Sequence, residues 1–168
     1  DTVQAVAYKG KVRWFWGDTL RASYPLGLFR TAGAVTPLDA TQKLDPADGI
    51  PYEYFAGKDG FAWAMMPLPE RPEGVTWIHA VFVVKDKAGK ERMLGHYSRR
   101  KGLADELEQG VCAWDDEKII FVPAKRLPLE EKWRMPKGHP IRFDEDGKDW
   151  LLFGSPNPNV RVPATYEA

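Results

Sequence analysis

The chain has 168 residues, and its 24 Lys and Arg balance 24 Asp and Glu. This length fits a single domain over residues 1–168 that can bury a core. The balanced, dispersed charges exclude the basic face that nucleic acid or an anionic membrane surface requires, and no segment approaches the roughly 20 apolar residues of a membrane-spanning helix. The one cysteine, Cys112, cannot form an intrachain disulfide, and no Cys or His spacing indicates a metal site or a cofactor.

Fourteen prolines and 15 glycines divide the chain into short segments, a spacing that long helices do not tolerate. The composition therefore predicts an all-β protein. Three units share one pattern, in which an apolar strand leads through a polar loop to a second short strand. The paired strands are Val12–Thr19 with Leu26–Thr31, Arg92–Ser98 with Gly110–Trp114, and Asp149–Ser155 with Asn159–Ala164. We interpret these units as a degenerate repeat.

Turn residues between the predicted strands indicate antiparallel hairpins. In chain order, the predicted pairs are Thr2–Tyr8 with the strand from Val12, Tyr52–Phe55 with Phe61–Met66, Thr76–Val84 with Glu91–Ser98, Val111–Trp114 with Lys118–Val122, and His139–Phe143 with Lys148–Phe153. The polar segment Ala32–Pro51 is predicted to be a long connection. One helix is predicted over Gly102–Gln109, where Leu103 and Leu107 have i, i+4 spacing.

Repeated antiparallel hairpins favour either a β-propeller or a β-sandwich or barrel. The three strand–loop–strand units favour the propeller, with each unit forming part of a blade. Blades repeat every ~40–50 residues, and a ring takes at least about four of them. We therefore expect the chain to be part of a longer propeller, or a half-ring completed by a partner chain or an oligomer. The start at Asp1 fits an exported mature chain, secreted or periplasmic, or a piece of a longer protein.

Between Trp77 and Trp114 the chain contains WIHAVFVVKD, GKERMLGHYSR and LEQGV in turn. These segments resemble a family of uncharacterised bacterial proteins that is itself similar to the five-bladed β-propeller glycoside hydrolases. Phe15–Thr19 is similar to the first-blade motif of that group, and Val160–Ala164 fits a later blade. The resemblance implies a five-bladed propeller more than twice as long as this chain. It also implies a carbohydrate ligand, with carboxylates that the inner strands aim at a central cavity.

Glycoside hydrolysis uses two carboxyl groups that face one pocket, one as the acid and the other as base or nucleophile. Asp18 is the candidate base, because it follows a strand and lies beside Trp16, whose ring could stack on a sugar. The alternative is a turn aspartate that bonds to its own backbone. Glu108 is the candidate acid, because it precedes a strand of the second unit. The alternative is an exposed charge on a helix.

Four further residues are candidates for holding a sugar. His96 and Arg99 lie where the Arg92–Ser98 strand ends, and they could hydrogen-bond sugar hydroxyls or a uronate carboxylate. His96 could equally be a half-buried histidine bonded to backbone. Trp77 and Trp16 are candidate stacking platforms, although most aromatic residues of a small all-β protein belong to its core.

These candidates lead to one main hypothesis and two alternatives. In the first, a carbohydrate-active protein resembling glycoside hydrolases uses Asp18 and Glu108 to cleave a glycosidic bond. In the second, a non-catalytic module binds a glycan or a protein through aromatic loops. In the third, the chain is a structural subunit that forms half of a propeller.

Overall fold

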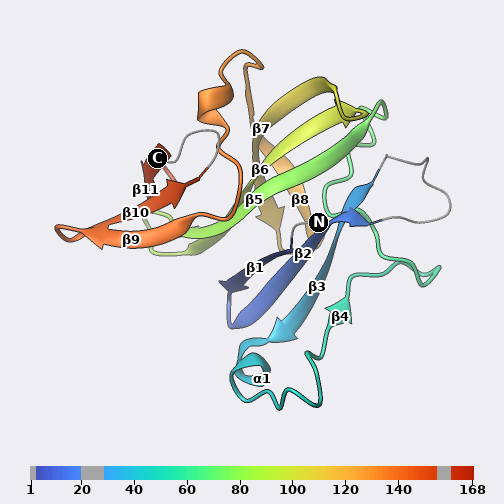
Figure 1. The fold of residues 1–168 in the computed structure, drawn as a ribbon, viewed down its shortest axis with the longest axis vertical. Coiled ribbons are helices and arrows are strands. Elements are labelled where there is room, and N and C mark those ends of the chain that lie inside the picture. Colours follow the sequence, from blue (N-terminus) through green and yellow to red (C-terminus); the bar gives the residue numbers. More distant parts are fainter. Residues whose placement is uncertain (1–2, 20–28, 155–159) are drawn as a thin grey trace.

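Three antiparallel sheets make up most of the structure, a computed structural model that describes residues 3–19, 29–154 and 160–168. Sheet 1 contains β1 (Val3–Tyr8), β2 (Lys11–Thr19), β3 (Arg30–Pro37) and β4 (Glu53–Tyr54); sheet 2 contains β5 (Val75–Lys85), β6 (Glu91–Lys101), β7 (Asp105–Asp115) and β8 (Ile120–Leu127); sheet 3 contains β9 (Ile141–Glu145), β10 (Lys148–Phe153) and β11 (Val160–Pro163). Two short helices, α1 (Leu38–Gln42) and a 3₁₀ helix (Lys132–Arg134), lie in connections (Figure 1). The all-β prediction is confirmed, and none of these described sheets closes into a barrel.

The strands follow one another in chain order within every sheet, so each sheet is an antiparallel meander. Two strand pairs of the predicted repeat are present, as β6 with β7 and β10 with β11. In the first unit β2 pairs with β3, which covers Arg30–Pro37 and overlaps the predicted strand Leu26–Thr31 only at its end. Each pair occupies the second and third places of its sheet. The β2–β3, β6–β7 and β10–β11 pairs therefore hold the same places in three separate sheets.

Aspartate side chains form several of the tight turns that separate the paired strands. The carboxylate of Asp86 accepts hydrogen bonds from the N–H groups of Ala88 and Lys90, at 3.0 and 2.9 Å, in the turn between β5 and β6. Asp115 caps the turn between β7 and β8 in the same way, and Asp144 caps that between β9 and β10. An aspartate that satisfies backbone N–H groups favours a local turn, which explains why the hairpin predictions here are confirmed.

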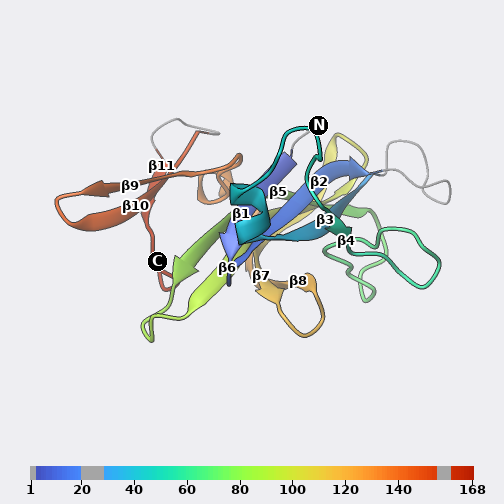
Figure 2. The same cartoon turned by 90° about the horizontal axis from the view of Figure 1, so that it is seen from below.

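Sheet 2 is the middle layer, and both of its faces are buried. Side chains alternate along β6, so that Met93 and Tyr97 belong to the apolar cluster shared with sheet 1, whereas Leu94 belongs to the cluster shared with sheet 3. The first cluster includes Phe15, whose ring lies 5.2 Å from that of Phe121. Figure 2 shows sheet 1 across one face of sheet 2, with sheet 3 extending to the other side.

Sheets 1 and 2 are aligned, so that equivalent connections gather at the same end. At one end, the turn residue Lys9 meets Glu91 and Asp116 through hydrogen bonds from its backbone N–H and its ammonium group. At the other end, the Trp77 indole N–H donates to the carbonyl of Phe29 at 2.9 Å. We call the first the turn end and the second the loop end, because the long connection from β4 to β5 enters there.

Two predictions about local structure are wrong. The predicted helix over Gly102–Gln109 is instead a turn followed by β7, which begins at Asp105. Opposite charges lie directly across β6 and β7, with Lys101 facing Asp105 and Arg99 facing Glu108. Such cross-strand pairs stabilise a sheet, and this pairing outweighs the helical spacing of two leucines.

The predicted connection over Ala32–Pro51 is also wrong in its first part, because β3 extends to Pro37 and is buried from Thr31 to Thr36. Its small residues fit a narrow space: a Cβ on Gly33 would lie 2.6 Å from the sulfur of Met65. The predicted strand over Leu26–Thr31 lies mostly outside the described residues. The predicted pair Tyr52–Phe55 with Phe61–Met66 is reduced to β4 and a bridge between Ala56 and Ala62.

Two histidines lie on the side of sheet 2 that faces sheet 3. The ring of His96 lies between those of Phe82 and Phe153, with centroids 5.4 Å away in both cases. Desolvation by burial lowers the pKa of His96 to about 4. His79 hydrogen-bonds Ser98 at 2.6 Å, and desolvation, with the nearby charges of Lys137 and Arg100, lowers its pKa to about 3. Both rings are therefore neutral at pH 7.

We predict that acidification from pH 7 to pH 5 destabilises the fold through these histidines. An unfolded histidine takes up a proton near pH 6.5, whereas folded His96 does so only near pH 4, so the unfolded state binds more protons in this window. Linkage then gives a loss of about 2 kcal/mol from His96 alone. Urea unfolding at pH 5, 6 and 7 should show a smaller pH dependence for His96→Gln. His139→Gln, which removes an exposed histidine, is the control; an unchanged slope in His96→Gln would contradict the prediction.

Candidate functional site

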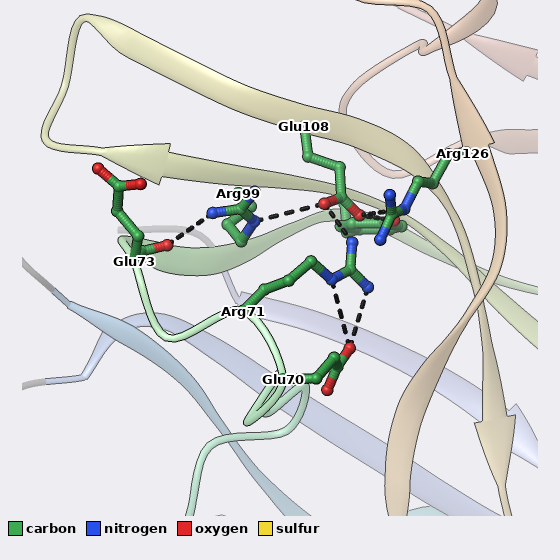
Figure 3. A network of polar contacts seen from close by, with 7 residues as sticks. Glu70, Arg71, Glu73, Arg99, Glu108 and Arg126 are labelled. Carbon is green, nitrogen blue, oxygen red and sulfur yellow. Dashed lines mark hydrogen bonds and ion pairs between the residues drawn. The ribbon is translucent and has the colours of Figure 1, made fainter.

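The carboxylate of Glu108 lies at the centre of a cluster of arginines near the loop end of sheet 2 (Figure 3). Its Oε1 accepts a hydrogen bond from the Tyr97 hydroxyl at 2.6 Å and pairs with Nε of Arg126 at 3.3 Å. Its Oε2 accepts from Nη1 of Arg71 and from Nε of Arg99, the latter at 3.4 Å. We call these five residues the arginine centre. Each carboxylate oxygen thus has two partners.

Sheet pairing brings the strand-borne members of the arginine centre together. Arg99 on β6 lies directly opposite Glu108 on β7, and Tyr97 shares their face because side chains two residues apart point to the same side of a strand. Arg126 on β8 lies opposite Gly110. A Cβ on Gly110 would lie 2.2 Å from the carbonyl oxygen of Lys125, so the close approach of β7 and β8 depends on this glycine.

Arg71 comes from the connection between β4 and β5, and it joins that connection to sheet 2. Its backbone N–H donates to the carbonyl of Leu68 at 2.9 Å, and Leu68 is buried in the core shared by sheets 1 and 2. Its guanidinium also donates from Nε and Nη2 to Glu70, at 3.3 and 3.1 Å. Arg99 donates to the carbonyl of Glu73 at 2.7 Å. The connection is therefore attached to the sheet at two points.

The electrostatics of the centre favour an ionised Glu108. Desolvation by burial opposes ionisation, but the hydrogen bonds from Tyr97 and Arg71 and the positive charges of Arg71 and Arg126 outweigh it, so the pKa of Glu108 is lowered. The hydrogen bond to Glu108 raises the pKa of Arg71. Three guanidinium groups face the carboxylates of Glu70 and Glu108, which leaves one positive charge in excess.

A carboxylate in this state is poorly suited to donate a proton. General acids in glycosidases have a raised pKa, whereas that of Glu108 is lowered. A carboxylate offers about four lone-pair sites. Hydrogen bonds from Tyr97, Arg71 and Arg99 use three of them, and the ion pair with Arg126 adds a fourth contact. Glu108 is therefore arranged to hold three arginines in place, and the free donors of the site belong to those arginines.

The structure brings Arg99 and Glu108 into contact, and it places Asp18 elsewhere on the strands. Asp18 is exposed in a bulge of β2 between Trp16 and Thr19, with a positive φ of 49°. Aspartate tolerates this left-handed conformation better than most residues. The four described partners of Glu108 do not include Asp18.

The remaining predicted residues have different surroundings. Trp16 is half-buried on the outer face of sheet 1, 5.3 Å from Tyr52 and 5.6 Å from Tyr54 between ring centroids. Trp77 is half-buried at the loop end, with the guanidinium of Arg100 5.5 Å from its ring centre. His96 is 6% exposed between sheets 2 and 3, on the face of β6 opposite to that of Arg99. Trp77 pairs with Ser98, so its side chain also lies on the face of sheet 2 opposite to that of Arg99.

Sequence reasoning missed Arg71 and Arg126. Arg71 is in a proline-rich connection, and its partner Glu108 lies 37 residues further along the chain, so no local pattern joins them. One signal for the strand pairing was present: Arg99, Arg100 and Lys101 precede a glycine, and Asp105, Glu106 and Glu108 follow it. Complementary charges on either side of a turn favour a hairpin.

An open depression of about 590 Å³ also lies at the loop end. It is lined by Glu73, Lys101, Ala104, Asp105, Glu106, Leu107, Leu129 and Lys132. Glu73 belongs to this lining and also accepts the hydrogen bond from Arg99. The loop end therefore presents a concave surface of mixed charge beside the arginine centre.

Other kinds of site find no support among the residues that the structure describes. They contain no group of three or more His, Cys, Asp and Glu side chains placed to hold a metal ion. Cys112 is fully buried, and burial raises the pKa of its thiol, which disfavours the nucleophilic thiolate. No helix in this part of the chain combines the length and apolar character needed to cross a bilayer.

We predict that Glu108→Gln lowers the free energy of unfolding by about 3 kcal/mol at pH 7, because it leaves three arginines around a neutral group. Glu145→Gln, which removes the exposed pair with Arg161 at 2.7 Å, is the control and should cost less than about 1 kcal/mol. Both values follow from urea unfolding.

The difference in the free energy of unfolding between wild type and Glu108→Gln should depend on pH. The folded pKa of Glu108 is lowered, so its contribution is complete above the ordinary glutamate pKa of about 4.3 and is lost as pH falls through the folded value. Wild type and Glu108→Gln should therefore converge in stability at acidic pH. A constant difference down to pH 2 would show that the charge of Glu108 does not stabilise the fold.

Comparison of the chain with models of known protein families and with curated proteins finds no match. Function must therefore be argued from the site itself, because a fold alone does not establish an activity.

Proposed function

We propose that this chain is a glycan-binding β module of the propeller type, with the glycan bound at the loop end beside the arginine centre. The observation that carries the proposal is the exposed guanidinium of Arg126, which the ionised carboxylate of Glu108 holds beside Arg71 and Arg99. A guanidinium group held in a fixed position presents several N–H donors in a set geometry. Such donors suit the hydroxyl and carboxylate oxygens of a sugar.

The propeller assignment is supported by the repetition of the meander. Each sheet runs in chain order, sheets 1 and 2 have four described strands each, and sheets 1 and 3 pack on opposite faces of sheet 2. Propeller blades are four-stranded sheets with this arrangement. The resemblance to five-bladed glycoside hydrolases is part of the proposal, and it places further blades outside this chain.

The outer faces of the sheet stack are consistent with further blades. Sheet 1 carries the cluster of Trp14, Trp16, Tyr52 and Tyr54, in which Tyr54 is 58% exposed. On sheet 3, the side chain of Ile141 is 66% exposed. In the proposal these faces pack against additional sheets, from a longer chain or from a partner, and Trp16 serves this packing because Tyr52 and Tyr54 already contact its ring.

Binding without cleavage is the form of the proposal that the site favours. Cleavage by Asp18 and Glu108 would require Glu108 to release a partner and take up a proton, against the effect of Tyr97, Arg71 and Arg126 on its pKa. The mixed-charge depression offers additional contacts for a sugar at the same end. A carbohydrate ligand is also consistent with the expected secreted or periplasmic location.

We predict that a panel of immobilised polysaccharides retains this chain, and that Arg126→Ala lowers its affinity at least tenfold. Arg126 is the appropriate residue, because its side chain is 61% exposed and its loss leaves Glu108 with three partners. Arg161→Ala is the control, since Arg161 is 47% exposed and paired with Glu145 on sheet 3. Affinity electrophoresis measures both. Equal retention of the two variants, or no retention of the wild type by any polysaccharide, would refute the proposal.

We also predict that this chain, purified alone, associates through the outer faces of its sheets. Trp14→Ser combined with Tyr54→Ser should shift the mass measured by light scattering toward that of a single chain. Trp133→Ser is the control, because Trp133 is 63% exposed outside these faces, in the 3₁₀ helix. A single chain at all concentrations would show that these faces do not recruit further sheets.

A further inference from the structure

We infer that the ligand of the arginine centre is an acidic sugar, whose carboxylate binds the guanidinium of Arg126. This inference rests on the proposed function and adds the chemical class of the ligand. It follows from the unequal way in which the three arginines of the centre are occupied.

Two of the three arginines use their guanidinium donors for contacts within the protein. Arg71 uses Nε, Nη1 and Nη2 for Glu70 and Glu108. Arg99 uses Nε for Glu108 and Nη1 for the carbonyl of Glu73. Their side chains are only 18% and 13% exposed. Neither can turn toward a ligand without breaking these contacts.

Arg126 differs from the other two in both respects. Its side chain is 61% exposed, and within the described residues its contact with the centre is the one from Nε to Oε1 of Glu108. The two terminal nitrogens therefore keep their donors for another group. Two parallel N–H donors match the two oxygens of a carboxylate, and this bidentate geometry is the preferred mode of arginine with carboxylates.

Charge supports the same class of ligand. Glu108 and Glu70 together balance two of the three arginines. The nearby Glu73 carboxylate is paired with Lys101 at 3.1 Å, so it does not offset the third. The uncompensated positive charge is thus the exposed one, on Arg126. A carboxylate on the ligand would neutralise this excess charge, whereas a neutral sugar would not.

The test compares oligogalacturonates with their methyl esters, which have the same sugar backbone without the negative charge. Isothermal titration calorimetry should show at least tenfold weaker binding of the ester to the wild type. Arg126→Gln should bind acid and ester equally. Arg126→Lys keeps the positive charge but lacks the two parallel N–H donors of a guanidinium, so it should retain only part of the preference for the acid over the ester. Arg161→Gln should behave as wild type. Unfolding curves of all variants confirm that they fold.

The outcomes separate the inference from the proposal on which it depends. Equal binding of acid and ester by the wild type would overturn the acidic-sugar inference and leave glycan binding intact. A preference for the acid that survives in Arg126→Gln would also overturn it, because the charge would then be recognised elsewhere. Failure to bind these oligosaccharides, together with failure on the polysaccharide panel, would refute the proposed function itself.

Discussion

The burial of both faces of sheet 2 is the constraint on which the rest of the structure depends. β6 alternates between two apolar clusters, with Met93 and Tyr97 on one side and Leu94 on the other. A sheet covered on both faces cannot slip in register without moving every side chain into the wrong layer. The register of β6 and β7 is thereby held, and with it the position of Glu108 opposite Arg99.

The arginine centre shows how this constraint produces a charged site inside an apolar fold. Glu108 is 7% exposed, and a buried carboxylate is strongly unfavourable unless it is paired and hydrogen-bonded. The three arginines and Tyr97 meet that requirement. The centre also joins the connection between β4 and β5 to sheet 2, so one carboxylate stabilises the loop end and orients the donors that face solvent.

Hairpins were predictable wherever the turn contains its own hydrogen-bond acceptor. Asp86, Asp115 and Asp144 each satisfy N–H groups within a few residues, and a pattern of this range is visible in the sequence. The helix predicted over Gly102–Gln109 was wrong because the conformation of this segment does not depend on local contacts. Its conformation is decided by Arg99 and Lys101 on the neighbouring strand, whereas the spacing of its leucines reflects only local geometry. Leu103 is in fact 81% exposed.

In the candidate site, too, local properties were predictable from the sequence and long-range contacts were not. Arg99 was recognisable as a charged residue near a strand end, because residue type and strand position are local properties. Glu108 was predicted to lie in a helix but lies within β7, and Trp77 lies on β5, at the edge of sheet 2. Their roles were not predictable: Arg71 reaches Glu108 across 37 residues of sequence. His96 was proposed to contact a sugar, and the packing of sheet 3 instead encloses it between Phe82 and Phe153.

The amino-acid sequence by itself determined the all-β class, the tight hairpins and the strand pairs β6 with β7 and β10 with β11, since these depend on side chains that lie near one another in the chain. Only the tertiary structure decided which face of each strand is buried, which arginines surround Glu108, and which one of them remains open to solvent. Those outcomes depend on contacts between separate sheets, where desolvation and charge pairing act together and leave no local trace in the sequence.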